Sequence, residues 1–251
     1  MNIFCTKRQA FHLACALILM TGIVMADSDQ VHWDYEGEDG PDYWGELTPA
    51  FSSCKKGKNQ SPIDLIGSLQ ADMPALNFDY QNTGQLLEEN TGHSIQEVVL
   101  PDNMVRLHNE VFELKQFHFH SPSEHTIQGR HYPMEVHFVH QSETGELLVV
   151  GLVFEEGRRN ALMDQLPSFR AARGEDPLVN GVDYNELVVG RDKYYYYNGS
   201  LTTPPCSEGV RWIVMQQPIE VSADQIQHYR DLLGFDNNRP IQPVNARIVL
   251  E

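Results

Sequence analysis

The chain has 251 residues, of which 41% are hydrophobic and 21% are charged, and these values are ordinary for a globular protein. Its formal net charge of −17 at pH 7 argues against nucleic acid or an anionic membrane surface as a partner, because charges of the same sign repel. Composition and charge exclude these partner classes but do not identify a substrate.

The N-terminal residues have the pattern of an export signal that is removed. Two basic residues precede an apolar run from Phe11 to Met25, and polar residues follow Ala26. A retained membrane anchor is the alternative, but the run is shorter than the roughly 20 residues that a spanning helix needs. We therefore predict a signal peptide over residues 1–26, cleaved near Ala26, and one domain over residues 27–251.

The cysteines support export. Cys5 and Cys15 lie in the predicted signal peptide, so Cys54 and Cys206 remain in the mature chain. Two cysteines in an exported chain are expected to pair, because export leads to an oxidising compartment. Two buried free thiols are the alternative. The sequence therefore predicts a periplasmic or secreted protein with one disulfide bond.

Strand signals dominate the chain after Val31. Short runs rich in β-branched and aromatic residues lie between clusters of turn-forming residues, for example Leu147–Phe154, Tyr194–Tyr197 and Trp212–Met215. No internal repeat or linker interrupts this rhythm. It predicts a single sheet-dominated domain, mostly antiparallel.

Helical signals are few. The strongest covers Ser222–Leu233, where Ser222 and Gln225 can form a capping box and Gly234 can end the helix. Asn160–Leu166 is a weaker candidate.

Two histidines alternate along a predicted strand, Leu114–His120. A period of two places Leu114, Gln116, His118 and His120 on one face of this strand. The two imidazoles are then close enough to share one metal ion. A catalytic zinc site takes three protein ligands and leaves a fourth position open, so a third ligand is expected from a neighbouring strand.

The segment Met134–His140 is the candidate for that neighbouring strand. Alternation places His137 on one face with Glu135 and Val139, and His140 on the other. The pattern alone does not choose between His137 and His140. A pair of exposed strand histidines without any metal is the alternative.

Eight segments, in this order along the chain, resemble the alpha-class carbonic anhydrases. They are Gly40–Trp44, Gln60–Leu65, Gln116–His120, Ser123–Thr126, Glu135–His140, Ser200–Pro205, Trp212–Val214 and Asn238–Pro243. The resemblance begins at His32 and runs almost to the C-terminus, and it fits the bacterial secreted or periplasmic type. It implies a β-dominated mixed α/β domain with a large twisted, mostly antiparallel central sheet of about ten strands and a few short peripheral helices.

The resemblance also implies Zn²⁺ as cofactor, with His118, His120 and His137 as its ligands, and so favours His137 over His140. In this family three neutral imidazoles leave the ion its full charge, and the pKa of its bound water falls to about 7. Zinc-bound hydroxide then attacks carbon dioxide to give bicarbonate.

Further roles follow from the same resemblance. The outer ring nitrogens of the ligands are expected to bind Gln116 (for His118), the backbone carbonyl of Asn237 (for His120) and Glu135 (for His137). The remaining expected site residues are Thr202 and Glu124, which orient the hydroxide, His93, which exports the proton, and the substrate-binding residues Val139, Val149, Leu201, Thr203, Val210 and Trp212. The resemblance also supports the pairing of Cys54 with Cys206.

The predicted function is reversible hydration of carbon dioxide, with carbon dioxide and bicarbonate as substrates and with sulfonamides and anions as inhibitors. The alternatives are a weakly catalytic binding protein of the same fold and a zinc esterase. A homodimer is left open, and no membrane span is expected after processing.

Overall fold

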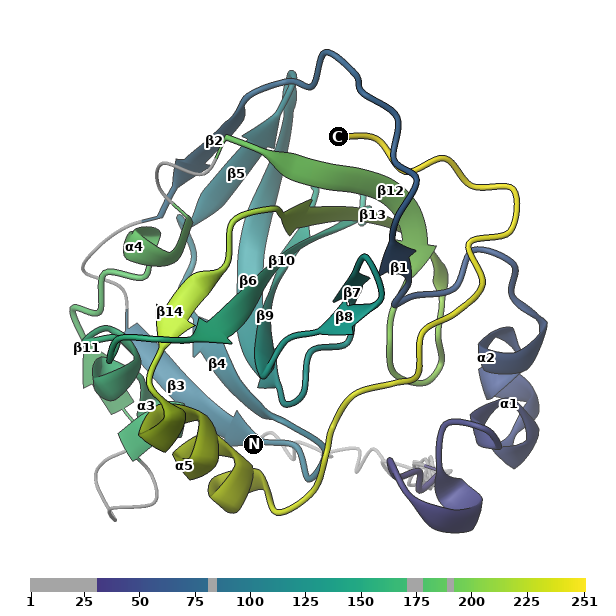
Figure 1. Ribbon diagram of the computed structural model, residues 1–251, viewed down its shortest axis with the longest axis horizontal. Helices are drawn as coiled ribbons and strands as arrows, with labels where there is room; N and C mark the ends of the chain where they lie inside the picture. Colours follow the sequence, from purple (N-terminus) through teal and green to yellow (C-terminus); the bar gives the residue numbers. More distant parts are fainter. Residues whose placement is uncertain (1–30, 81–84, 171–177, 189–191) are drawn as a thin grey trace, which may run out of the picture. The chain divides into compact units, whose positions relative to one another are not determined.

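The computed structural model describes residues 31–80, 85–170, 178–188 and 192–251. The predicted signal peptide, residues 1–26, lies outside the described residues, as does its cleavage site. Residues Val31–Glu251 belong to one folded unit (Figure 1). No helix among the described residues is long and apolar enough to cross a membrane.

Strands make up most of the regular structure in the described part of the chain. They are β1 (Asp64–Leu65), β2 (Leu76–Asp79), β3 (Gln85–Asn90), β4 (Ile95–Val99), β5 (Met104–Leu107), β6 (Glu110–His120), β7 (Thr126–Ile127), β8 (Arg130–His131), β9 (Met134–Gln141), β10 (Leu147–Glu156), β11 (Leu178–Asn180), β12 (Tyr194–Ser200), β13 (Glu208–Met215) and β14 (Ile219–Val221). The helices are short: η1 (Gly37–Asp39), α1 (Trp44–Leu47), η2 (Pro49–Phe51), α2 (Ser53–Lys56), η3 (Met163–Gln165), α3 (Pro167–Arg170), α4 (Asn185–Val188) and α5 (Ala223–Leu233).

Among the described residues, eleven strands form one twisted sheet (Figure 1). Its main path is β11-β3-β4-β6-β9-β10-β13-β12, with β5 also paired to β6, β2 to β5, and β14 to β10. Neighbours are antiparallel except that β13 and β14 both run parallel to β10. A small second sheet contains β1, β7 and β8. The predicted fold class is therefore confirmed.

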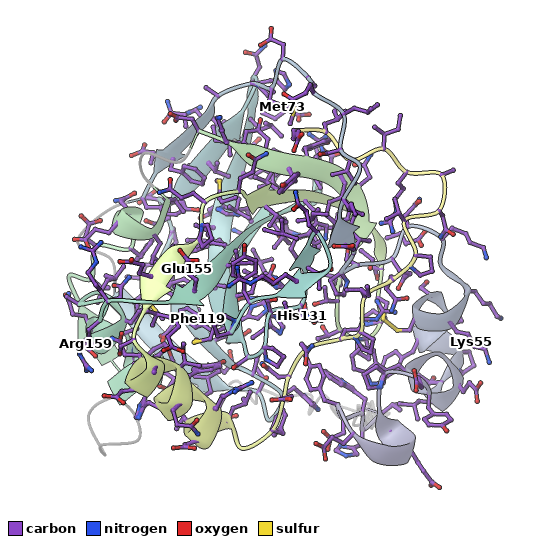
Figure 2. The ribbon with its side chains drawn as sticks, viewed as in Figure 1. Lys55, Met73, Phe119, His131, Glu155 and Arg159 are labelled. Atoms are coloured by element: carbon purple, nitrogen blue, oxygen red, sulfur yellow. A yellow bond between two sulfur atoms is a disulfide. The ribbon has the colours of Figure 1, made fainter. Side chains whose placement is uncertain are left out.

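The two faces of the large sheet have different roles because side chains alternate along each strand. Phe117, Phe119, Val136 and Phe138 from β6 and β9 are fully buried in the larger hydrophobic core. In Figure 2 Phe119 lies in the interior. The residues between them on each strand, including His118 and His137, point to the opposite face, which carries the histidines beside apolar side chains such as Val139.

The pairing of β6 with β9 contains a β-bulge that corrects one prediction. The register moves from Leu114 opposite His140 to Gln116 opposite Val139, so Lys115 is an extra residue. The side chain of Leu114 consequently joins the larger core instead of sharing a face with Gln116. The prediction for Leu114 was wrong, because alternation does not continue through a bulge.

The helix predictions had different outcomes. Helix α5 begins after Ser222, whose side chain forms a capping box with Gln225, and it ends at Gly234 in the left-handed conformation (φ 83°). This confirms the stronger candidate. In Asn160–Leu166 the structure has only the 3-10 turn η3.

Glu97 is an acid buried on the core face of β4. Ile95, Glu97 and Val99 form the buried side of this strand, and Glu97 has 0% exposure. One carboxylate oxygen accepts a hydrogen bond from the backbone N–H of Ser168 (2.8 Å), whereas Oε2 has no partner. Burial raises the pKa of the Glu97 carboxyl to about 7. The protonated form is therefore favoured in the folded protein.

We predict that Glu97→Gln stabilises the protein at alkaline pH. The pKa of Glu97 is near 7 in the folded protein, raised from 4.5. The contribution of Glu97 to the free energy of unfolding is therefore largest below pH 4.5 and is lost as the pH rises through 7. Linkage sets the loss at about 3 kcal/mol above pH 8. Urea unfolding at pH 4 and pH 8.5 should show equal stability at pH 4 and a more stable variant at pH 8.5. A stability difference that does not depend on pH would contradict this assignment, and the exposed Glu89→Gln is the control.

Candidate metal centre

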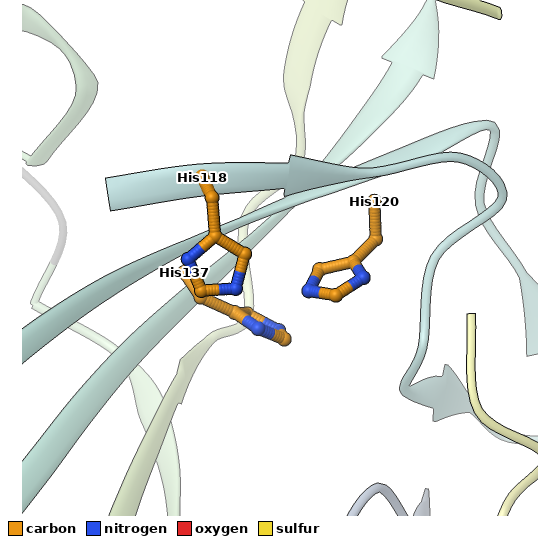
Figure 3. Close-up of side chains that lie close together, drawn as sticks. All are labelled: His118, His120 and His137. Carbon is orange, nitrogen blue, oxygen red and sulfur yellow. The ribbon is translucent and has the colours of Figure 1, made fainter. Parts of the chain in front are cut away.

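Three histidines from β6 and β9 meet on the face of the sheet opposite the larger core (Figure 3). His118 lies directly opposite His137 in the antiparallel register, and His120 follows two residues later on β6. One ring nitrogen from each histidine lies within 4.8 Å of the other two. The ring centroids are 5.0 Å (His118–His120), 5.4 Å (His118–His137) and 4.5 Å (His120–His137) apart.

His140 belongs to the other face. It is fully buried beside Tyr80, whose hydroxyl lies 2.6 Å from His140 Nε2, and its Nδ1 lies 3.2 Å from the carbonyl oxygen of Leu148. Burial lowers the pKa of His140 to about 3. The structure thus brings His137, and not His140, beside His118 and His120.

Each of the three histidines has its outer ring nitrogen hydrogen-bonded to an oxygen atom. His118 Nδ1 donates to Gln116 Oε1 (2.8 Å), and His120 Nδ1 donates to the carbonyl oxygen of Asn237 (2.6 Å). His137 Nε2 donates to Glu135 Oε1 (2.8 Å). These are the three partners that the resemblance implies. They leave His118 Nε2, His120 Nε2 and His137 Nδ1 as the free nitrogens.

The free nitrogens fit a zinc ion. His120 Nε2 is buried and has no hydrogen-bond partner, which is costly unless another group binds it. Burial lowers the pKa of His118 well below its usual value, and the neighbouring His120 and His137 lower it further. A neutral imidazole with a free lone pair is the form that binds zinc.

Glu135, the hydrogen-bond partner of His137, is itself held in place by further hydrogen bonds. Its carboxylate also accepts hydrogen bonds from His125 Nδ1 (2.7 Å) and from the backbone N–H groups of Glu124 (2.9 Å) and His125 (2.8 Å). Burial would raise its pKa, but His125 and His137 outweigh burial and hold the pKa well below its usual value. A Cβ atom at Gly151 would lie 2.9 Å from Glu135 Oε1, so glycine leaves the space for this carboxylate. The alternation of side chains along the strands gives no sign that His125 contacts Glu135. The only signal in the sequence is that His125 directly follows Glu124.

Glu124 and Thr202, the two residues expected to orient the hydroxide, are both buried. Glu124 Oε1 accepts a hydrogen bond from the backbone N–H of Arg239 (2.9 Å). Its Oε2 lies 3.6 Å from His120 Nε2 and 3.8 Å from His137 Nδ1, and it has no hydrogen-bond partner. Among the described residues no hydrogen bond joins Thr202 to Glu124, so that expected contact stays a prediction.

The five apolar residues expected at the substrate lie in one hydrophobic cluster, which is separate from the larger core. They are Val139, Val149, Leu201, Val210 and Trp212. Val149 on β10 pairs with Val139 on one side and with Trp212 on the other. The Trp212 ring lies 4.8 Å from the His137 ring, so this apolar surface adjoins the histidines. Thr203 is half-buried in the loop after β12.

His93 lies in the hairpin between β3 and β4 and is half-buried. Its ring stacks on Trp33 at 3.6 Å with an interplanar angle of 9°. Its Nε2 donates a hydrogen bond to the carbonyl oxygen of Trp33 (2.7 Å), which assigns the proton of a neutral ring to Nε2 and leaves Nδ1 as the acceptor. Trp33 therefore fixes the ring, a role that alternation in the sequence does not indicate.

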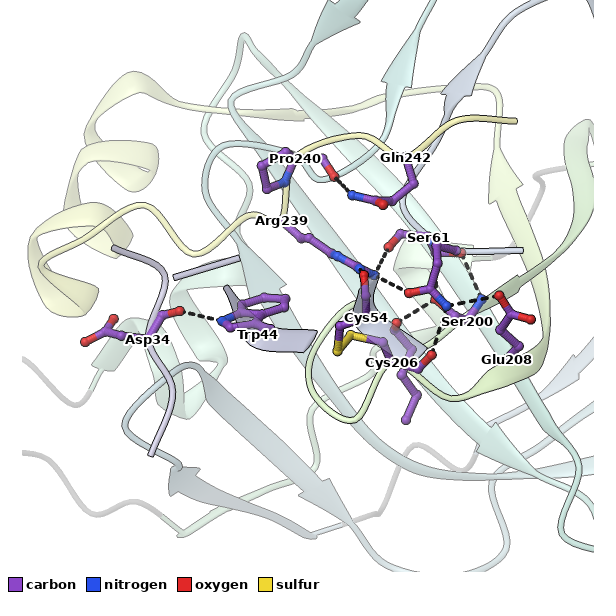
Figure 4. The surroundings of a disulfide bond; sticks show 12 residues. Asp34, Trp44, Cys54, Ser61, Ser200, Cys206, Glu208, Arg239, Pro240 and Gln242 are labelled. Atoms are coloured by element: carbon purple, nitrogen blue, oxygen red, sulfur yellow. Dashed lines mark hydrogen bonds between the residues drawn. A yellow bond between two sulfur atoms is a disulfide. The ribbon is translucent and has the colours of Figure 1, made fainter. Parts of the chain in front are cut away.

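A disulfide bond joins Cys54 to Cys206 (Figure 4), as predicted. Cys54 lies in α2, and Cys206 lies in the loop that carries Thr202 between β12 and β13. The backbone of that loop is closed by hydrogen bonds from Leu201 N to Ser207 O (3.0 Å) and from Cys206 N to Thr203 O (2.8 Å). The disulfide thus anchors the loop of Thr202 to the N-terminal helices.

A three-histidine centre beside an apolar surface, carried on a large twisted sheet, is the arrangement expected of the carbonic anhydrases. The model of the eukaryotic-type carbonic anhydrase family matches residues 39–251. A carbonic anhydrase of Pectobacterium carotovorum is 44% identical over 243 residues, covering 95% of this chain and 98% of its own.

Solved structures agree with this match. The alpha-carbonic anhydrase of Thermovibrio ammonificans, in complex with the inhibitor sulfanilamide, has a TM-score of 0.81 at 42% identity and covers 88% of this chain and 99% of its own. The Photobacterium profundum alpha-carbonic anhydrase has a TM-score of 0.77 at 41% identity, with 88% and 100% covered. The chain belongs to the alpha carbonic anhydrase family. The family and the enzyme class predicted from the motifs are confirmed, and membership supports hydration of carbon dioxide.

We predict that native protein prepared without reductant has no titratable thiol and that Cys206→Ser lowers its melting temperature. The two cysteines are separated by 152 residues. In the chain-entropy description, closing such a loop stabilises the fold by at most about 5 kcal/mol. Differential scanning calorimetry of the wild type, the variant and reduced wild type measures the effect. Two thiols that react in the native wild type would show that the bond does not form.

Proposed function

We propose that this protein catalyses the zinc-dependent, reversible hydration of carbon dioxide to bicarbonate and a proton. His118, His120 and His137 would hold the metal, Thr202 and Glu124 would orient the nucleophile, and His93 would export the proton. The convergence of three imidazole nitrogens, each on a ring whose other nitrogen donates to an oxygen atom, carries the proposal. This arrangement supports three neutral ligands with fixed tautomers.

Zinc bound in this way supplies a Lewis acid that makes hydroxide available near neutral pH. The chain supplies the rest of the site. Carbon dioxide has no net dipole, so the cluster around Val149 and Trp212 suits its binding beside the histidines. The same apolar surface excludes water from the space where the substrate carbon would lie.

Glu124 and Thr202 would set the direction of the nucleophile. Glu124 is fully buried and accepts a hydrogen bond from the backbone N–H of Arg239. An ionised carboxylate has no proton to donate, so it can only accept hydrogen bonds. A threonine hydroxyl beside it would have to donate to the free Oε2 and would then accept from the attacking oxygen. This turns a lone pair of that oxygen toward carbon dioxide. A sulfonamide nitrogen that is anionic but keeps one hydrogen meets the same requirement, which supports sulfonamides as inhibitors.

His93 would take the proton at Nδ1, the ring nitrogen that is free of a hydrogen bond in the stacked ring. Histidine suits this role because its usual pKa lies near neutrality. The half-buried position of the ring allows exchange with buffer.

We also propose that the protein acts outside the cytoplasm, in the periplasm or after secretion. The Cys54–Cys206 bond supports this location, because disulfide bonds persist in oxidising compartments. The pattern over residues 1–26 supports it independently.

The ligand assignment predicts that His118→Ala, His120→Ala and His137→Ala each reduce zinc content and lower hydration activity by at least about 100-fold, since loss of a ligand costs no less than loss of its support. His140→Gln, which keeps an acceptor for Tyr80, should retain one zinc per chain. Mass spectrometry of bound metal and stopped-flow hydration assays give the two readouts. Loss of zinc from His140→Gln with retention in His137→Ala would overturn the assignment.

Proton export predicts a different signature for His93→Ala. Steady-state turnover in dilute buffer should fall by up to about 100-fold, the lower end of what a positioned acid or base contributes, whereas exchange of carbon dioxide with bicarbonate at equilibrium should stay near wild type. Added imidazole should restore part of the turnover. His108→Asn is the control, because His108 is an exposed histidine with φ 54°, a conformation that asparagine tolerates. An equal loss in the exchange rate would contradict a role in proton export.

A further inference from the structure

Arg239 is a buried cation that lies outside the group of three histidines. It is 1% exposed and lies in the C-terminal segment after α5. Its Nη1 donates to Gln60 Oε1 (2.9 Å) and to the carbonyl oxygen of Ser61 (2.8 Å), and its Nη2 donates to the carbonyl oxygen of Cys54 (3.0 Å) (Figure 4). Burial lowers its pKa to about 10, so the guanidinium is still charged at neutral pH. A buried charge with three directed contacts fixes its own backbone closely.

That backbone supports two groups of the metal centre. The N–H of Arg239 donates to Glu124 Oε1 (2.9 Å). Two residues earlier, the carbonyl oxygen of Asn237 accepts from His120 Nδ1 (2.6 Å), and Asn237 Oδ1 accepts from the N–H of Ser121 (2.8 Å). A shift of this segment would therefore displace His120 and Glu124 together.

A second chain of hydrogen bonds begins at Ser61, whose carbonyl oxygen binds the guanidinium. Ser61 Oγ lies 2.9 Å from the Tyr197 hydroxyl, and that hydroxyl lies 2.6 Å from His125 Nε2. His125 Nδ1 binds Glu135 Oε1 (2.7 Å), which also accepts from His137 Nε2 (2.8 Å). All five residues are buried. This chain of hydrogen bonds ends at His137, whereas the segment around Asn237 supports His120.

We propose that Arg239 is a positioning residue for the metal centre, because its guanidinium ties together the support of His120 and Glu124 and the support of His137. The inference rests on the proposed function, since it assumes that these histidines bind zinc. Both cysteines of the disulfide bond belong to the same junction, meaning the group of contacts around the guanidinium. The carbonyl oxygen of Cys54 accepts a hydrogen bond from Arg239, and Gln60 Nε2 donates to the carbonyl oxygen of Cys206 (3.0 Å).

The shape of the guanidinium matters as well as its charge. Three acceptors converge on two of its nitrogens, which a planar fork with several fixed donors can satisfy. The Glu124 carboxylate interacts favourably with this charge and raises the pKa of Arg239 against the effect of burial. Lysine would keep the charge but would present a single ammonium, so Arg239→Lys should fold and yet lose part of the junction.

Zinc release from the holoenzyme tests this role directly. Arg239→Lys and wild type are loaded with zinc, and release to a chelator in excess is followed at a temperature where circular dichroism shows both to be folded. We expect release on the order of 10- to 100-fold faster in Arg239→Lys, the range for loss of a residue that orients a metal ligand. The visible spectrum of the cobalt-substituted variant should also differ from wild type, because it reports ligand geometry.

Leu166→Ala is the matched control. Leu166 is fully buried in the larger core, so its truncation lowers overall stability without touching either support. Its zinc release and cobalt spectrum should resemble those of wild type. Wild-type release rates in Arg239→Lys, or equal acceleration in Leu166→Ala, would overturn the positioning role. Wild type that binds no zinc would instead overturn the proposed function, and this inference with it.

Discussion

The candidate metal centre depends on hydrogen bonds that occupy one nitrogen of each imidazole. An imidazole has two nitrogens, and only the one without a proton can bind a metal. Oxygen atoms of Gln116, Asn237 and Glu135 accept hydrogen bonds from the outer ring nitrogens, so the other nitrogen of each ring stays free to bind a metal. Because all three acceptors are held by the sheet or by the C-terminal segment, the orientation of the rings is a property of the whole domain.

The sheet meets this requirement through its alternation. One face of β6 and β9 carries aromatic and aliphatic side chains into the larger core, which fixes the strands, while the other face presents the histidines. The apolar cluster around Val149 and Trp212 occupies the same face as the histidines. Polar and apolar surfaces therefore meet at the centre, as an enzyme acting on a small apolar gas requires.

Local patterns predicted the local features. The period of two placed His118 and His120 on one face, and the capping box predicted α5, because both signals act over a few residues. The same period did not choose between His137 and His140 as the third ligand, since it places them on opposite faces of β9 without saying which face meets His118 and His120. Their pairing with β6 distinguishes them, because His137 lies opposite His118 whereas His140 lies opposite Leu114.

Long-range features were less accessible from the residues alone. The bulge that sends Leu114 into the core breaks an alternation that the sequence continues without interruption. Glu97 has the appearance of a surface acid, and its burial depends on packing against α3. The carbonyl of Asn237 carries no side-chain signal, and it lies 117 residues from His120. The motifs could suggest that contact only through family resemblance.

X-ray absorption at the zinc edge of the purified protein is the most direct test that three imidazole nitrogens converge on one metal. We expect three imidazole nitrogens at about 2.0–2.1 Å and one further light ligand, in a four-coordinate site. A sulfur scatterer, or a shell of six oxygen ligands, would contradict it.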